Sequence, residues 1–124
     1  ALLALVHPGY EVMILELAKS VLETAGYLVV PARHGIEALA LVKEAKQKGE
    51  PIDLMILDLT VPSGMGGKET VFKLREFDKM TPVICSSGYS RDEVMSDPAK
   101  FGFADKLPKP YRVKDMLEVV VNNL

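Results

Sequence analysis

The chain has 124 residues, a formal net charge of −2 and one cysteine, Cys85. This charge gives no basic surface for direct binding to nucleic acid or an anionic membrane. A single cysteine excludes an internal disulfide and favours a reducing cytoplasm. No apolar run approaches the roughly 20 residues that cross a bilayer. We expect residues 1–124 to be a single domain of a longer multidomain protein, and a membrane anchor elsewhere in that protein is compatible with this expectation.

Five short apolar runs alternate with amphipathic stretches along the chain. The apolar runs predict strands over Leu2–Val6, Tyr27–Pro31, Ile52–Leu57, Pro82–Cys85 and Phe103–Leu107. The amphipathic stretches predict helices over Val12–Ala25, Ile36–Lys48, Gly67–Phe77, Arg91–Phe101 and Val113–Leu124. The fourth helix has the poorest pattern, because the pair Asp97-Pro98 interrupts it.

This alternation predicts an α/β fold, a five-stranded doubly wound parallel sheet with five helices. Strands buried on both faces show continuous apolar runs, as these do. Sheets of this kind carry chemistry at the carboxyl ends of their strands. Three polar features fall there: Asp58 after the third run, Ser86 and Ser87 after the fourth, and Lys109 after the fifth. We therefore expect one site that combines an acid, a hydroxyl and a base.

Three segments around these residues, DLTVPSGMGG, PVICSSGYS and GFADKLPKPY, resemble the signature segments of response-regulator receiver domains. The resemblance covers nearly the whole chain and is greatest to the receivers of hybrid sensor histidine kinases. It implies a flavodoxin-like fold with strand order 2-1-3-4-5, which accepts a phosphoryl group from phosphohistidine onto an aspartate with Mg²⁺. By position, Asp58 matches the acceptor, Ser87 the switch hydroxyl, and Lys109 the lysine before a cis bond to Pro110.

The chemistry of these residues suits the implied roles. An aspartate can act as a nucleophile and form an acyl phosphate. Lys109 is a point-charge donor for the oxygens of the transferring group, and the Ser87 hydroxyl can rotate toward one of them. We expect self-phosphorylation and slow hydrolysis at most, without conventional turnover. The implied partners are a histidine kinase or phosphotransfer domain and other domains of the parent chain.

The loop after the first strand departs from the receiver pattern. Aligned backwards from LETAGY, the positions of the family's two adjacent acids hold Gly9 and Tyr10. The predicted Mg²⁺ ligands are then Asp58, Glu11 and the backbone of Thr60. Mg²⁺ is usually bound by carboxylate oxygens, and the family's acid pair is replaced in this chain, so we expect the chain to bind Mg²⁺ weakly.

A second departure lies three residues before the signature lysine, where the family has an aromatic residue and this chain has Lys106. A lysine does not fill an apolar pocket as an aromatic ring does. We expect Lys106 to stay solvated or to reach an acid such as Asp105 or Glu118. Tyr111 is then the aromatic candidate for the output face.

Three alternatives stay open at this point. The replaced acid pair favours a pseudo-receiver, which would bind proteins without being phosphorylated. A flavodoxin-like protein could bind a small ligand through HPGYE, although that loop lacks the hydroxyls of a phosphate cradle. A phosphatase of the haloacid-dehalogenase type also uses a strand-end aspartate, but DLTV lacks the second aspartate of that motif.

Overall fold

The computed structural model describes residues 1–7, 12–59, 66–88 and 92–124. The strands are β1 (Leu2–Val6), β2 (Leu28–Ala32), β3 (Leu54–Asp58), β4 (Val83–Ser87) and β5 (Asp105–Pro108). The helices are α1 (Val12–Thr24), α2 (Gly35–Gln47), α3 (Gly67–Leu74), α4 (Glu93–Ser96), the 3₁₀ helix η1 (Pro98–Phe101) and α5 (Val113–Asn123).

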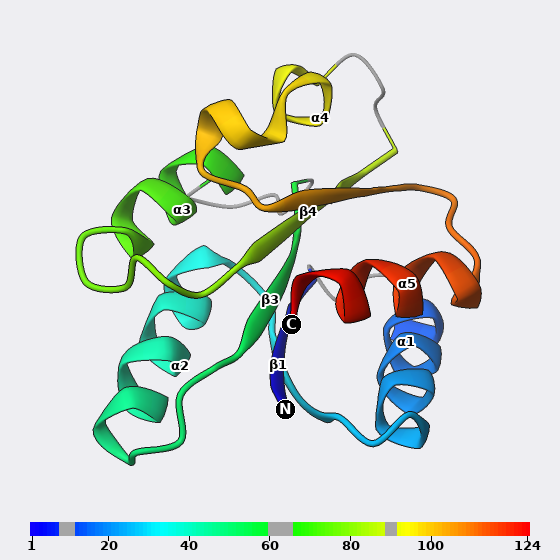
Figure 1. Ribbon diagram of the computed structural model, residues 1–124, viewed down its shortest axis with the longest axis horizontal. Helices are drawn as coiled ribbons and strands as arrows, with labels where there is room; N and C mark the ends of the chain where they lie inside the picture. The colour runs from blue at the N-terminus through cyan, green and yellow to red at the C-terminus, as the bar shows by residue number, and fades with distance from the viewer. Residues whose placement is uncertain (8–11, 60–65, 89–91) are drawn as a thin grey trace.

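The strands form one parallel sheet in the order β2-β1-β3-β4-β5. This confirms the predicted fold class and strand order. Helices α1 and α5 lie side by side on one face, and α2, α3 and α4 cover the other (Figure 1).

Each strand supplies side chains to both faces of the sheet, because successive side chains alternate. In β1, Leu3 and Leu5 join the core beneath α1 and α5, whereas Ala4 and Val6 join the core beneath α2, α3 and α4. All four are buried. The two cores explain why the strands appear in the sequence as continuous apolar runs, and they hold the strand ends in a fixed register.

The predicted fourth helix is divided in the structure. Residues 93–96 form α4, Asp97 has φ −149° and ψ 75°, and Pro98 begins η1. Proline lacks an N–H and disfavours helical geometry in the residue before it, so Asp97 leaves the helix. Strand β5 also differs from its prediction, since it begins two residues later, at Asp105.

Candidate functional site

Asp58 is the last residue of β3 and is 3% exposed. The register places Leu57 opposite Val6 of β1, and Asp58 opposite Ser86 of β4. The carboxylate therefore lies at the edge where the carboxyl ends of the central strands meet. A buried charge of this kind requires partners, because removing it from water is costly.

Lys109, directly after β5, provides one partner. Its Nζ donates to Oδ2 of Asp58 at 2.5 Å, across 51 positions of sequence. The Lys109 N–H donates to the carbonyl of Ser87 at 3.0 Å, and the peptide bond to Pro110 is cis, as the resemblance implies. The structure thus brings the predicted acid and base into direct contact.

His7, to which the sequence analysis gave no role, also faces Asp58. The backbone N–H of His7 donates to the carbonyl of Ala32 at 2.8 Å, and this bond fixes the residue just beyond the end of β1. Its Nε2 lies 3.7 Å from Oδ2 of Asp58, and the residue is 6% exposed. Two nitrogen groups, from His7 and Lys109, therefore converge on one carboxylate oxygen.

The two serines of β4 have different surroundings. The Ser86 hydroxyl donates to the carbonyl of Leu107 at 2.8 Å and so joins β4 to β5. Ser87, at the end of β4, is 2% exposed and lines a hollow of about 110 Å³ together with Met95 and Lys109. These surroundings favour Ser87 over Ser86 as the hydroxyl near the acceptor.

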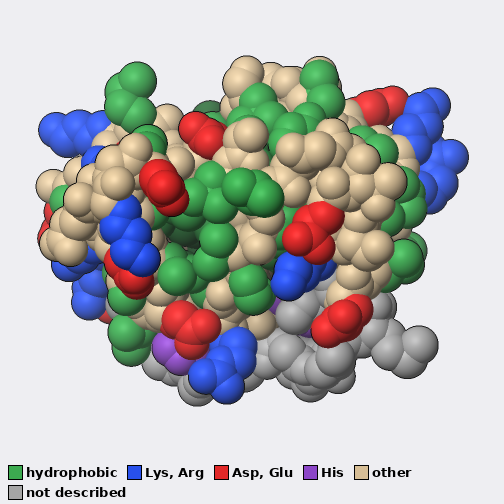
Figure 2. Space-filling model, turned by 90° about the horizontal axis from the view of Figure 1, so that it is seen from below, with side chains coloured by type: hydrophobic (Ala, Val, Ile, Leu, Met, Phe, Trp, Pro, Cys, Tyr) green, Lys and Arg blue, Asp and Glu red, His purple; other side chains and the backbone are tan. Residues whose placement is uncertain are grey.

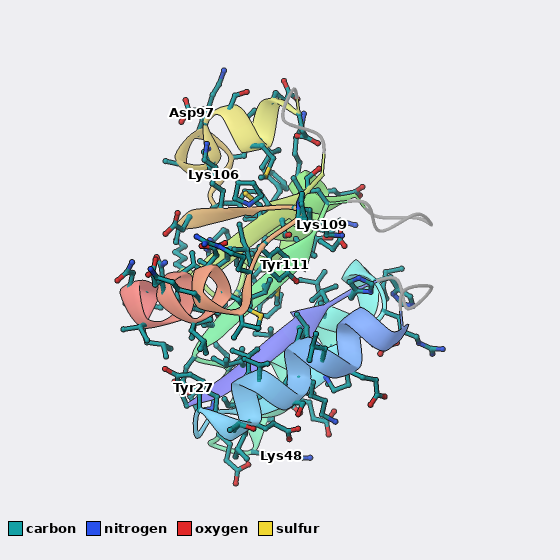
Figure 3. All side chains as sticks on the ribbon, turned by 90° about the vertical axis from the view of Figure 1, so that its right-hand side faces the viewer. Tyr27, Lys48, Asp97, Lys106, Lys109 and Tyr111 are labelled. Atoms are coloured by element: carbon teal, nitrogen blue, oxygen red, sulfur yellow. The ribbon has the colours of Figure 1, made fainter. Side chains whose placement is uncertain are left out.

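Lys106 was expected either to stay solvated or to reach an acid such as Asp105 or Glu118, and the first alternative agrees with the structure. Lys106 is exposed, but its Nζ donates to the backbone carbonyl of Met95 in α4 at 3.1 Å. Oδ2 of Asp105 instead accepts from the Asn123 amide at 3.0 Å. A carbonyl near the end of a helix attracts a cation as an acid does, so the ammonium binds α4. Figure 3 shows Lys106 beside η1 and Lys109 further along the same segment.

Tyr111 lies on the opposite side of the sheet from α4. It is partly buried and packs against the core beneath α1 and α5 (Figure 3). It lines a small hollow together with Leu17 and Val113, which are both exposed. Lys106 and Tyr111 therefore belong to two different surfaces.

The described residues do not fit Mg²⁺ well. Within residues 1–7, 12–59, 66–88 and 92–124, no group of three or more His, Cys, Asp or Glu side chains is arranged so that it could hold a metal ion. Mg²⁺ prefers oxygen ligands in octahedral geometry, whereas Asp58 faces an imidazole nitrogen of His7 on the side of β1. The predicted ligands Glu11 and Thr60 lie outside the described residues, as do Gly9 and Tyr10.

Comparisons with known proteins agree with this fold. The response regulator receiver domain matches residues 11–121, so the chain belongs to that family. The sensor kinase CckA of Brucella abortus is 33% identical over 102 residues, which cover 80% of this chain and 10% of CckA. The transcriptional regulatory protein CpxR of Escherichia coli is 33% identical over 103 residues, which cover 82% of this chain and 40% of CpxR. The chain thus spans less than half of either relative.

Two solved structures show the same architecture. The chemotaxis protein CheY4 of Vibrio cholerae has a TM-score of 0.85 at 27% identity, and the match covers 100% of this chain and 98% of that one. The response regulator TrrA of Thermotoga maritima, solved in complex with Mg²⁺-BeF, has a TM-score of 0.78 at 28% identity, with 99% and 98% covered.

The charged side chains on one face of the molecule agree with the nearly equal numbers of acidic and basic residues in the sequence (Figure 2). On the face drawn in Figure 2, acidic and basic side chains are intermingled, without a continuous basic patch. Among the described helices, none combines the length and the apolar character that a bilayer crossing requires.

Proposed function

We propose that this receiver domain accepts a phosphoryl group on Asp58 from the phosphohistidine of a histidine kinase or phosphotransfer domain. The carboxylate attacks phosphorus, the P–N bond breaks, and the imidazole of the donor leaves as an aspartyl phosphate forms. The observation that carries the proposal is the 2.5 Å contact between Lys109 Nζ and Asp58 Oδ2, at the edge where the strands end.

Lys109 has the charge and position to stabilise this transfer. Negative charge spreads over the phosphoryl oxygens during the reaction, so a fixed ammonium beside the nucleophile lowers the barrier. Ser87 would offer a hydroxyl to the product, because it lines the same hollow as Lys109. The nucleophile and the hydroxyl are the last residues of β3 and β4, and the ammonium belongs to the residue directly after β5, so the sheet positions all three.

The output of the domain would be a change in a protein-binding face. Phosphorylation makes the charge at Asp58 more negative, to about −2, which attracts Lys109 and Ser87 more strongly. The hollow that Ser87 and Lys109 line also reaches Met95 of α4, the residue that Lys106 binds. The partner would be another protein or another domain of the parent chain. The likeness to CckA supports a hybrid sensor kinase as that parent.

The single cysteine supports the cytoplasm as the compartment of this chemistry. Mg²⁺, with Asp58, Glu11 and the Thr60 backbone as ligands, stays a prediction from the family resemblance. The imidazole nitrogen of His7 beside Asp58 is a poor ligand for Mg²⁺, and it favours one competing function, a pseudo-receiver that binds proteins without phosphorylation.

Intact mass spectrometry separates the two functions. The protein is incubated with acetyl phosphate, in Mg²⁺ and separately in EDTA, beside Asp58→Asn and the control Asp53→Asn. Asp53 precedes the opposite end of the same strand, where its Oδ2 accepts from the Leu2 N–H. We expect one phosphoryl adduct on the parent and on Asp53→Asn, and none on Asp58→Asn. A folded parent without an adduct in either buffer would establish the pseudo-receiver.

A further inference from the structure

His7 is a buried titratable side chain with no part in the transfer described above. His7 directly follows β1, which lies next to the central strand β3, and its backbone hydrogen bond to Ala32 fixes its position. Its Nε2 faces Oδ2 of Asp58 at 3.7 Å, and Lys109 Nζ lies 2.5 Å from the same oxygen. The register explains the contact, because Val6 lies opposite Leu57 and the next residues on each strand are therefore neighbours.

This arrangement suits an anion better than a hard cation. A divalent metal bound by Asp58 on the side of β1 would face Nε2 of His7, which lies 3.7 Å from Oδ2 of the carboxylate. An imidazole nitrogen is a ligand for transition metals rather than for Mg²⁺. A phosphoryl group, by contrast, needs donors and positive charge on several sides, and nitrogen groups of His7 and Lys109 supply them.

We propose that His7 takes the place of a metal ligand, so that a phosphoryl group on or beside Asp58 is bound between His7 and Lys109 without a divalent cation. The part that concerns phosphoryl transfer rests on the proposed function. Asp58 would still attack phosphorus and displace the leaving group. The His7 ring would contact a phosphoryl oxygen on the side of β1, while Lys109 contacts one on the side of β5.

Calorimetric titration with MgCl₂ measures the affinity of the protein for Mg²⁺ directly and needs no phosphorylation. We expect no saturable binding of millimolar Mg²⁺ to the parent, and an affinity at least about tenfold higher in His7→Asp, which places a second carboxylate beside Asp58. Saturable Mg²⁺ binding to the parent that Asp58→Asn abolishes would overturn the proposal. If Glu11→Gln also abolished it, the ligand set predicted from the sequence would hold instead.

The chain has two histidines, so NMR of the imidazole C–H groups can test whether a phosphate anion binds beside His7. His34 is the internal control, since its Nδ1 accepts from the Glu37 N–H at the start of α2. In EDTA, inorganic phosphate should shift the His7 signals and leave those of His34 unchanged. Phosphate that leaves the His7 signals unmoved would overturn this part of the proposal.

Adduct formation supplies the third test. With acetyl phosphate, the parent should form the phosphoryl adduct in EDTA at a rate within about twofold of that in Mg²⁺. The reason is that the His7 and Lys109 side chains stabilise the negative charge of the transition state. His7→Asp should become dependent on Mg²⁺, and His34→Asn should match the parent. A parent that reacts only with Mg²⁺ overturns the proposal. Absence of any adduct on a folded parent refutes phosphoryl transfer, while the calorimetric titration still decides whether His7 excludes the metal.

Discussion

Lys109 and Asp58 form an ion pair at 2.5 Å at the ends of β5 and β3, two strands that β4 separates in the sheet. The side chain of Asp58 is 4% exposed and that of Lys109 is 23% exposed. The pair therefore connects the middle of the sheet to its edge strand, and it explains how a carboxylate is tolerated as the last residue of the fully buried strand β3.

Removing the lysine should cost more stability than removing the acid. Lys109→Met leaves a buried carboxylate with weaker compensation, so we expect the free energy of unfolding to fall by about 1–3 kcal/mol. Asp58→Asn removes the charge itself and should cost less. In urea unfolding, the double variant should be more stable than the sum of the single changes predicts. Additive losses would contradict direct coupling between these two side chains.

Asp78 should make stability depend on pH. Burial acts to raise its pKa, but hydrogen bonds from Thr81 and Met80 and the charge of Lys46 hold the pKa below its usual value. A folded-state pKa below the unfolded one stabilises the protein above the unfolded value. That stability is lost as the pH falls through the folded-state pKa.

We therefore expect Asp78→Asn to lower the free energy of unfolding by about 1–3 kcal/mol at neutral pH. Urea unfolding should show this difference shrinking below about pH 4, where the parent carboxylate becomes protonated. The exposed Asp97→Asn should show little loss at either pH. A loss for Asp78→Asn that stays constant from neutral to acidic pH would contradict the assignment.

Cys85 should be chemically inert in the folded protein. It is fully buried in β4, and burial raises the pKa of its thiol to about 11. Since the thiolate is the reactive form, an aromatic disulfide reagent at pH 8 should label the thiol only in urea, with one thiol released per chain. Rapid labelling of the native protein would show that β4 opens readily.

Lys106 should stabilise α4 locally rather than the whole domain. Lys106→Met removes the 3.1 Å bond to the Met95 carbonyl, near the end of a helix of four residues. Hydrogen exchange measured by mass spectrometry should accelerate in residues 93–101, while global stability changes by less than about 1 kcal/mol. Lys114→Met on α5 is the matched control and should leave that segment unchanged. Equal exchange in both variants would contradict the role of Lys106.

The strand pattern carried most of the fold and part of the site. Continuous apolar runs bounded by polar residues placed Asp58, Ser87 and Lys109 at strand ends, and a parallel sheet necessarily brings those ends to one edge. The division of α4 was also indicated, because Pro98 acts through local backbone geometry.

The two contacts that were missed depend on tertiary structure. His7 follows its apolar run as directly as Asp58 follows the third, and that position was the available indication. Alignment from the end of the first helix instead predicted that Gly9 and Tyr10 occupy the positions of the family's two acids. The bond from Lys106 to Met95 joins an exposed side chain to a backbone carbonyl, and no residue pattern specifies such a partner.

The central claim is that Asp58 becomes phosphorylated, and chemical trapping tests it most directly. Borohydride reduces an aspartyl phosphate to homoserine, so the parent is treated with acetyl phosphate, reduced, digested and sequenced by mass spectrometry. We predict homoserine at position 58 in the parent and none in Asp58→Asn. Homoserine at a different acid, or none in a protein that remains folded, would contradict it.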